Sequence, residues 1–250
     1  MPFVGRSRLV VRRGSSGATG NVYAGLHEFE EMAFLLHLLR PDDLFIDVGA
    51  NIGSYTVLAG AVSGASVITV EPVPETFARL MENIRLNDLG ERVSARNIGL
   101  SSRAGRLRFT TGLDAANHAL APGEAAEGQT VEVEVTTLDA LTAPRMPVLC
   151  KIDVEGLEVE LLEGAPKTLA SPELLAVILE LGSGVTPAGR ADTLCYDRME
   201  ALGFLPYWYE PFQRTLTPSH RGGSASGNAL FIRDLAAVEA RVRAAPRREI

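Results

Sequence analysis

Several residue types and patterns are scarce in this sequence. Only two of the 250 residues are cysteine, Cys150 and Cys195, and both lie in apolar or helical contexts, which excludes a disulfide framework. No apolar run reaches the about 18 residues that a membrane-spanning helix needs. Residues 1–11 hold no apolar stretch followed by a small-residue cleavage site, so no secretory signal is predicted. We therefore expect a cytoplasmic protein without a membrane association.

Basic residues are also in the minority. The chain has 24 Lys and Arg against 31 Asp and Glu, a formal net charge of −7, and only Lys151 and Lys167 among the 24 are lysine. This balance argues against a general nucleic-acid binder. Apolar residues make up 46% of the chain, which predicts a folded protein long enough for one sizeable α/β core.

The order of apolar patterns predicts the fold class. Helical spacing over 26–39 is followed by a continuous apolar run at 44–48, a helix at 54–62, a strand at 66–70, a helix at 74–86 and a strand at 93–98. After an interruption, strands at 148–154 and 175–181 alternate with helices at 158–169 and 191–202. Such alternation predicts a doubly wound, mostly parallel sheet covered on both faces. Residues 204–209 and 229–233 predict a closing antiparallel hairpin.

The interruption and the two ends define the expected organisation. Residues 107–110 and 131–135 alternate as strands, so we predict a β-excursion at about 105–137, with a mobile loop over 115–129 that folds over the ligand-binding edge of the sheet. Residues 1–25 form an N-terminal extension with a Gly/Ser-rich loop at 14–20, and the first 20 residues are poor candidates for core. Residues 26–233 form the main domain, and residues 234–250 a C-terminal helix and tail.

The sharpest local signal is the run Asp47-Val-Gly-Ala-Asn-Ile-Gly53, where strand gives way to helix. Glycines at this turn let the backbone approach a ligand, and the helix N-terminus offers free N–H groups. Dinucleotide folds use Gly-x-Gly-x-x-Gly here, whereas Asn51 replaces the second glycine. The Asp47 carboxylate repels a pyrophosphate but suits an ammonium group. The motif therefore favours an amino-acid-bearing nucleoside over NAD.

Glu71 stands at the tip of the next strand and is followed by Pro72. An acid at this position can accept hydrogen bonds from both ribose hydroxyls, as in dinucleotide enzymes. An exposed acid that caps the next helix is the alternative. Because Asp47 and Gly49 stand at the neighbouring strand end, Glu71 is better explained as a residue that binds a nucleoside.

Three motifs in this order resemble the FkbM-type methyltransferase family: Asp43-Leu-Phe-Ile-Asp-Val-Gly-Ala-Asn-Ile-Gly-Ser-Tyr-Thr56, Val70-Glu-Pro72 and Lys151-Ile-Asp-Val-Glu-Gly156. The likeness covers residues 26–233. It implies a Rossmann-like class I methyltransferase with a seven-stranded sheet whose last strand is antiparallel, S-adenosylmethionine as donor, and usually O-methylation. Family substrates include sugars, macrolides and other secondary metabolites, so the implied acceptor is a small molecule or a glycan.

The resemblance also assigns residues to the donor. Four positions of the glycine turn would hold its methionine end, Glu71 its ribose, and Pro72 would shape the adenine slot. Asn97, just past the third strand, would lie near the adenine. The cofactor-binding set is thus Asp47, Gly49, Asn51, Gly53, Glu71, Pro72 and Asn97.

The third motif and the following strand supply the catalytic candidates. Asp153 and Glu155 have alternate directions along a strand, so we expect only one to face the site. We choose Asp153, with Glu155 as a cap of the following helix. Glu180 ends the next strand, where it can act as a base or pair with Asp153 around a divalent cation, although two carboxylates give little support for a metal.

His118 is the third catalytic candidate, because it lies in the predicted mobile loop and histidine accepts a proton near neutral pH. A solvated loop histidine is the alternative. The sequence predicts an S-adenosylmethionine-dependent methyltransferase that acts on a hydroxyl. The rival hypotheses are an NAD-dependent oxidoreductase, a non-catalytic donor-binding module, and an RNA methyltransferase, which the Arg6–Arg13 cluster alone favours.

Overall fold

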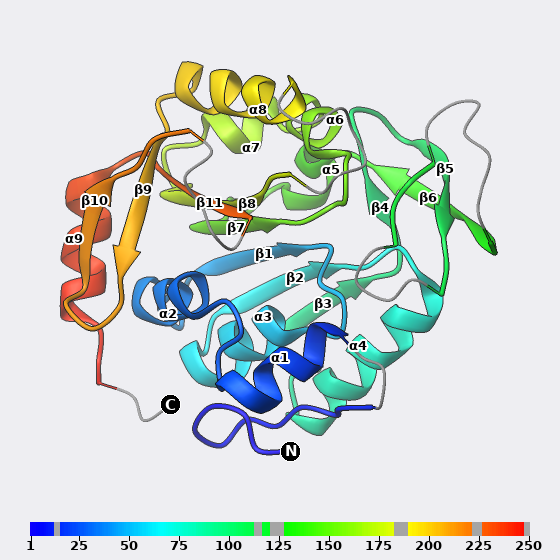
Figure 1. Cartoon of the computed structure of the whole chain (residues 1–250), viewed down its shortest axis with the longest axis horizontal. Helices are drawn as coiled ribbons and strands as arrows, with labels where there is room; N and C mark the ends of the chain where they lie inside the picture. The colour runs from blue at the N-terminus through cyan, green and yellow to red at the C-terminus, as the bar shows by residue number, and fades with distance from the viewer. Residues whose placement is uncertain (13–15, 113–116, 121–127, 183–189, 222–226, 248–250) are drawn as a thin grey trace.

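A mixed eight-stranded sheet crosses the middle of the molecule (Figure 1). The computed structural model describes residues 1–12, 16–112, 117–120, 128–182, 190–221 and 227–247. In order across the sheet, the strands are β10 (Thr215–Pro218), β9 (Leu205–Glu210), β11 (Asn228–Ile232), β8 (Ala176–Glu180), β7 (Leu149–Ile152), β1 (Leu44–Val48), β2 (Ser66–Val70) and β3 (Val93–Arg96).

Strand directions match the prediction except at one edge. Neighbours from β8 to β3 are parallel, and β11 is antiparallel to both β8 and β9. The predicted count of seven strands is wrong, because β10 pairs antiparallel with β9 as an eighth. Its sequence, Thr-Leu-Thr-Pro, is short and ends in proline, which suits an edge strand but gives little periodicity to detect.

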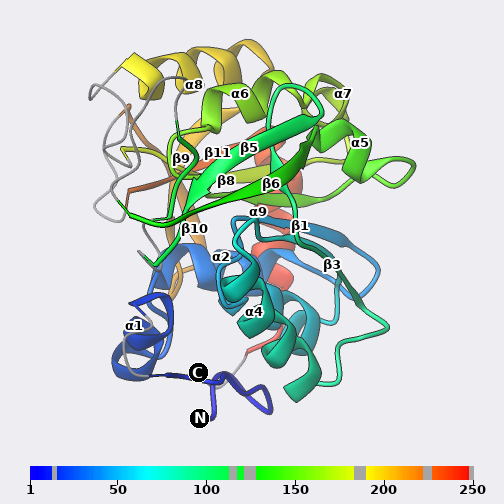
Figure 2. The same cartoon turned by 90° about the vertical axis from the view of Figure 1, so that its right-hand side faces the viewer.

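Helices cover both faces of the sheet (Figure 2). One layer holds α1 (Ser16–Ala24), α2 (Phe29–Leu38), α3 (Ser54–Val57), the π-helical turn η1 (Leu58–Ser63), α4 (Pro74–Leu86) and α9 (Leu235–Ala244). The other layer holds α5 (Leu138–Thr142), α6 (Glu158–Glu163), α7 (Pro166–Ala170) and α8 (Arg190–Ala201). Phe45 packs into the first core and Ile46 into the second, as the alternation of a doubly covered strand requires.

Two predicted helices differ from the structure. The helix expected at 158–169 is interrupted between α6 and α7, where Gly164 lies so close to the backbone of Ser101 that a Cβ would be 2.3 Å from its carbonyl oxygen. Pro166 then begins α7, as suits a proline in a first turn. The helix expected at 54–62 begins at Ser54 but continues as η1.

The N-terminal segment contributes to the core, contrary to expectation. Val4 and Leu9 are fully buried, and the backbone N–H of Val10 donates to Asn83 of α4 at 2.7 Å. Most of the predicted Gly/Ser-rich loop forms α1. Too few apolar residues stand between the arginines to reveal this packing in the sequence. Within the described residues, no helix is long and apolar enough to cross a membrane.

The predicted β-excursion forms a separate three-stranded sheet, β4-β6-β5, made of β4 (Gly99–Leu100), β5 (Gly105–Thr110) and β6 (Thr130–Thr136). It stands beside the carboxyl ends of the parallel strands (Figure 1). Most of the loop predicted at 115–129 lies outside the described residues, but 117–120 is held against β5 through a bridge between Phe109 and Ala119. The small sheet therefore borders the edge where ligands of such folds bind.

Candidate active site

A cavity of about 350 Å³ opens at the carboxyl ends of β1, β2, β7 and β8. Its walls include seven of the predicted site residues: Asp47, Gly49, Asn51, Glu71, Pro72, Asp153 and Glu180. The predicted residues Gly53, Asn97 and His118 are not among the lining residues. The motifs from four separated strands thus converge on one space, as the rule for open α/β sheets requires.

The glycine turn wraps tightly around the end of β1. Gly49 has a φ of +74° and its N–H donates to the carbonyl of Val70 at 3.0 Å. A Cβ on Gly49 would lie 1.6 Å from the carbonyl oxygen of Asp153, so no side chain fits there. Gly53, at φ +90°, begins α3 and lies against Leu80. Gly53 therefore shapes the turn without lining the cavity.

Glu71 is fixed by two backbone donors. One carboxylate oxygen accepts from the N–H of Val73 at 2.9 Å and the other from the N–H of Asn51 at 3.0 Å. Asn51 adopts a φ of +51°, which asparagine tolerates better than most residues. Burial raises the pKa of Glu71 to about 7, although both hydrogen bonds lower it. Each oxygen keeps a lone pair for a ligand in the cavity.

Asp47 lies deep in the same wall, with 1% of its surface exposed. The hydroxyl of Thr56 donates to one carboxylate oxygen at 2.6 Å. Burial raises the pKa of Asp47 to about 6, against the Thr56 hydrogen bond and the charge of Lys151. The group is mainly ionised at neutral pH and therefore presents a negative charge to the cavity.

Lys151 and Glu180 set the charge state of Asp153. The buried Lys151 ammonium lies 2.8 Å from Asp153 Oδ2, and Glu180 hydrogen-bonds to the same carboxyl group. Burial alone would raise the pKa of Asp153, but Lys151 and Glu180 lower it on balance. Burial, that hydrogen bond and the Asp153 charge raise the pKa of Glu180 to about 10. At neutral pH, Glu180 is therefore the protonated partner and Asp153 the ionised one.

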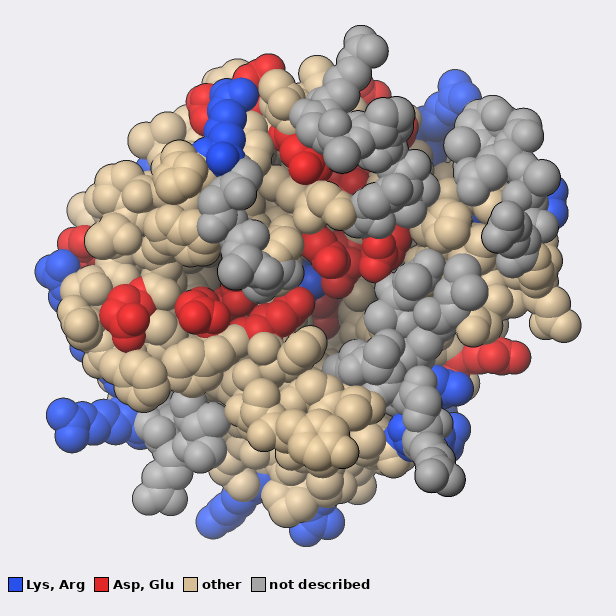
Figure 3. Space-filling model, viewed as in Figure 1, with Lys and Arg blue, Asp and Glu red and all other residues tan. Residues whose placement is uncertain are grey.

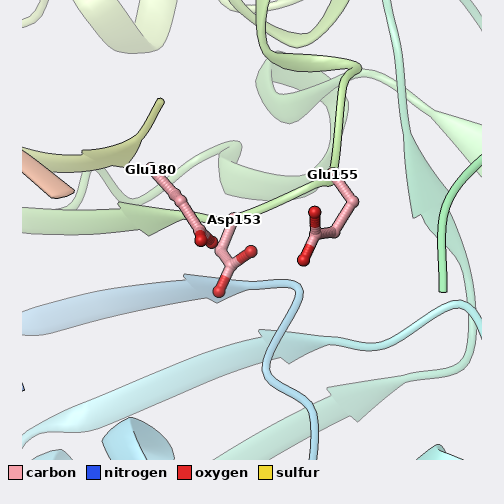
Figure 4. A group of neighbouring side chains, drawn as sticks. All are labelled: Asp153, Glu155 and Glu180. Atoms are coloured by element: carbon pink, nitrogen blue, oxygen red, sulfur yellow. The ribbon is translucent and has the colours of Figure 1, made fainter. Parts of the chain in front are cut away.

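Glu155 also faces the cavity, so the prediction that only Asp153 would do so is wrong. Strand β7 ends at Ile152, and Glu155 adopts a φ of +51° that ends the alternation of directions. The carboxylates of Asp153, Glu155 and Glu180 converge (Figure 4), with ligand atoms within 4.8 Å of one another. Burial raises the pKa of Glu155 to about 7, with help from Asp153. Glu158, and not Glu155, accepts the N–H of Gly156 before α6.

Glu28, just before α2, and Tyr55 of α3 also line the cavity, and no sequence pattern pointed to either residue. The Tyr55 hydroxyl donates to Glu28 at 2.5 Å, and the Lys151 ammonium lies 5.1 Å from the centre of the Tyr55 ring. Burial raises the pKa of Tyr55 well above its usual range, and the negative charge of Glu28 raises it further. Tyr55 is therefore a neutral hydrogen-bond donor that ties Glu28 to the site.

Comparison with known sequences identifies the family of this chain. A family model described as the methyltransferase FkbM domain matches residues 47–205, more than half of the chain. This chain belongs to the FkbM methyltransferase family. The matched segment begins at Asp47 and includes both the glycine turn and the carboxylate cluster, so most of the cavity wall lies within the family match.

Two characterised relatives share part of the FkbM domain. Hexuronic acid methyltransferase AglP of Haloferax volcanii is 33% identical over 162 residues, which cover 64% of this chain and 64% of that protein. Methyltransferase sdnD of Sordaria araneosa is 27% identical over 169 residues, which cover 54% of this chain and 65% of its own. The matches thus span slightly less than two thirds of either relative.

The fold agrees with a solved member of the family. The FkbM methyltransferase of Methylobacillus flagellatus superposes with a TM-score of 0.50 at 16% identity, over 78% of this chain and 44% of that one. At this identity the comparison shows a shared fold. Together with the family match, it establishes the methyltransferase-like α/β architecture, with a larger mixed sheet than predicted.

Two predicted residues of this FkbM chain lie near the cavity without lining it. The Asn97 amide donates to the carbonyls of Glu71 and Pro72 at 2.8 and 2.9 Å and so holds the loop after β2. The His118 backbone N–H donates to the hydroxyl of Thr110 at 3.0 Å, and the His118 charge lowers the pKa of nearby Glu155. Asn117, its neighbour, does line the cavity. Both predicted roles, at the adenine and as base, stay predictions.

Proposed function

We propose that this protein is an S-adenosylmethionine-dependent methyltransferase that methylates a hydroxyl group of a small molecule, such as a sugar or a secondary metabolite. The proposal rests mainly on the negative charge of the cavity walls. Asp47 and Asp153 are mainly ionised at neutral pH, Glu71 with a pKa of about 7 is about half ionised, and all three stand at strand ends. Buried Lys151 is already paired with Asp153. Figure 3 shows acidic side chains gathered across the middle of this face. A cationic donor fits such walls, whereas the pyrophosphate of NAD does not.

The wall residues suit the parts of the donor one by one. The donor supplies an electrophilic methyl group on a sulfonium and carries an ammonium group at one end. Asp47 and the backbone of the glycine turn would hold that methionine end, and the free lone pairs of Glu71 would accept the ribose hydroxyls. Pro72, fixed through Asn97, would flank the adenine. Asp153 would then face the methyl group and the acceptor.

Asp153 is our proposed general base. Of the three converging carboxyl groups, Glu180 is protonated at neutral pH and Glu155 is about half protonated, which leaves Asp153 as the fully ionised one. Asp153 accepts the hydroxyl proton as the methyl group moves to the hydroxyl oxygen. A sulfonium is a strong electrophile, so alignment supplies much of the rate and a weak base suffices.

The relatives support a small acceptor, since one of them is a hexuronic acid methyltransferase. The net charge of −7 disfavours RNA as acceptor. We place the reaction in the cytoplasm, where the two buried free cysteines, Cys150 and Cys195, stay reduced. The rival of a non-catalytic donor-binding module predicts donor binding without turnover, so methyl transfer to any acceptor excludes it.

The donor site is tested by Glu71→Ala. Loss of charge-assisted hydrogen bonds should cost about 1.5–3 kcal/mol, which weakens donor binding by one to two orders of magnitude. Calorimetric titration with S-adenosylmethionine or its demethylated product measures this effect. Glu75→Ala is the matched control, because Glu75 is exposed in the first turn of α4 and outside the cavity. Equal affinity of both variants would remove Glu71 from the donor site.

A divalent cation at the carboxylate cluster is the second question. Three converging carboxylates suit Mg²⁺, but the Lys151 ammonium and the Glu180 hydrogen bond already satisfy Asp153. We therefore expect equal rates of methyl transfer in EDTA and in Mg²⁺. A rate that is lost in EDTA and restored by Mg²⁺ or Mn²⁺ would instead make the cluster a metal site.

A further inference from the structure

A second cavity, of about 120 Å³, lies beside the first, between α2 and the strands β9 and β11. It forms because these two strands diverge. The pair Tyr207 and Leu230 is the last one that joins β9 to β11. Beyond it, β9 pairs only with β10, and β11 pairs only with β8. The cavity is smaller than a typical ligand pocket, so it suits one substituent of a ligand.

The two cavities adjoin along the carboxyl edge of the sheet. Asn228 lines the second cavity and is the register partner of Glu180, which lines the first. Glu31 lines the second cavity, and its charge raises the pKa of Tyr55 in the wall of the first. A molecule with its reacting group near Asp153 can therefore extend a substituent into the second cavity.

Aromatic rings and carboxylates make up the chemistry of the second cavity. Its walls include Tyr196, Tyr207, Trp208 and Tyr209, together with Glu30 and Glu31 of α2. Glu31 is 7% exposed and Trp208 is 37% exposed. Aromatic faces beside carboxylates are the surroundings in which proteins hold organic cations. The Tyr196 ring already takes a cation on one side, where the Arg221 guanidinium lies 5.6 Å from its centre.

No basic side chain lines this cavity among the described residues, and the nearby charge of Arg221 is matched by Asp197 and Glu200. An anionic substituent here would face Glu30 and Glu31 without a partner. A neutral sugar would gain stacking alone, whereas a protonated amine gains the attraction of both carboxylates and rings.

We propose that the second cavity binds a protonated amine of the acceptor, so that the acceptor is an amine-bearing molecule such as an amino sugar. This inference rests on the proposed methyl transfer. It separates this protein from its hexuronic acid methyltransferase relative, whose named substrate carries a carboxylate.

Trp208 gives a local readout, because it is the only tryptophan of the chain and it lines the second cavity. Its fluorescence is followed with donor-saturated protein during titration with the methyl glycosides of glucosamine, glucose and glucuronic acid. These probes share one ring and differ in charge. We expect the amino sugar to bind about tenfold or more tightly than the neutral sugar. The uronic acid should bind most weakly.

Glu30→Gln and Glu31→Gln should each reduce this preference, and exposed Glu30 can be replaced without disturbing the core. Glu91→Gln, an exposed acid next to β3 at the far side of the sheet, is the control and should keep it. Equal binding of the three glycosides, or a preference that survives both substitutions, would overturn the proposal. If calorimetry shows donor binding while Trp208 responds to no glycoside, only this inference fails; absence of donor binding would instead refute the proposed function.

Discussion

Asp153→Asn is expected to lower kcat by about 100-fold or more, with little change in the Kd of the donor. The amide keeps the shape of the side chain but cannot accept the hydroxyl proton. In the proposed site, groups at the ends of β1 and β2 would hold most of the donor, and the substitution leaves them in place. Single-turnover methyl transfer with saturating donor measures the rate, and calorimetry measures the affinity.

The surroundings of Asp153 require two controls. The substitution leaves buried Lys151 without its ionised partner, so the melting temperature of the variant must be compared with that of the parent. Asp88→Asn is a matched exchange at an exposed turn position with a φ of +54°, which asparagine tolerates. It should change neither kcat nor stability. If Asp153→Asn keeps its kcat, the base lies elsewhere and His118→Gln becomes the next variant to measure.

The parts of the site that the sequence predicted are local ones. A continuous apolar run followed by Asp47 and two glycines defines a strand end and a turn within one short segment. Glu71 follows the next run in the same way. Both predictions depend only on neighbours in the chain, and the structure places both residues in the cavity wall.

The parts that the sequence did not predict depend on backbone conformation or on distant segments. Glu155 faces the cavity because its positive φ breaks the alternation expected from β7. Glu28, the residue before α2, reaches the site because α2 packs against η1 and the Tyr55 hydroxyl of α3 donates to Glu28 across 27 positions. Val4 and Leu9 join a core built from residues far along the chain, and the backbone N–H of neighbouring Val10 donates to Asn83. None of these contacts leaves a periodic pattern in the sequence.

Gly49→Ala is expected to destabilise the protein strongly. Two effects combine at this position: the positive φ, which costs about 1–2 kcal/mol for an L-residue, and the approach of Asp153. The new Cβ would lie 1.6 Å from a backbone oxygen, and a backbone cannot rotate away as a side chain can. Strand β1 and the turn after β7 would have to separate. We expect a total loss of more than about 3 kcal/mol in the free energy of unfolding.

Gly203→Ala separates these two effects. Gly203 has a φ of +84°, but nothing lies within 4 Å of the position of a Cβ, so only the conformational cost applies. Urea unfolding of both variants should give about 1–2 kcal/mol for Gly203→Ala, and at least twice as much for Gly49→Ala. Donor affinity should fall only in Gly49→Ala, because moving the turn displaces the backbone N–H of Asn51 that fixes Glu71. Equal losses of stability in the two variants would mean that the turn after β1 can move away from Asp153 at little cost. The close approach of this turn to Asp153 would then not determine the shape of the proposed donor site.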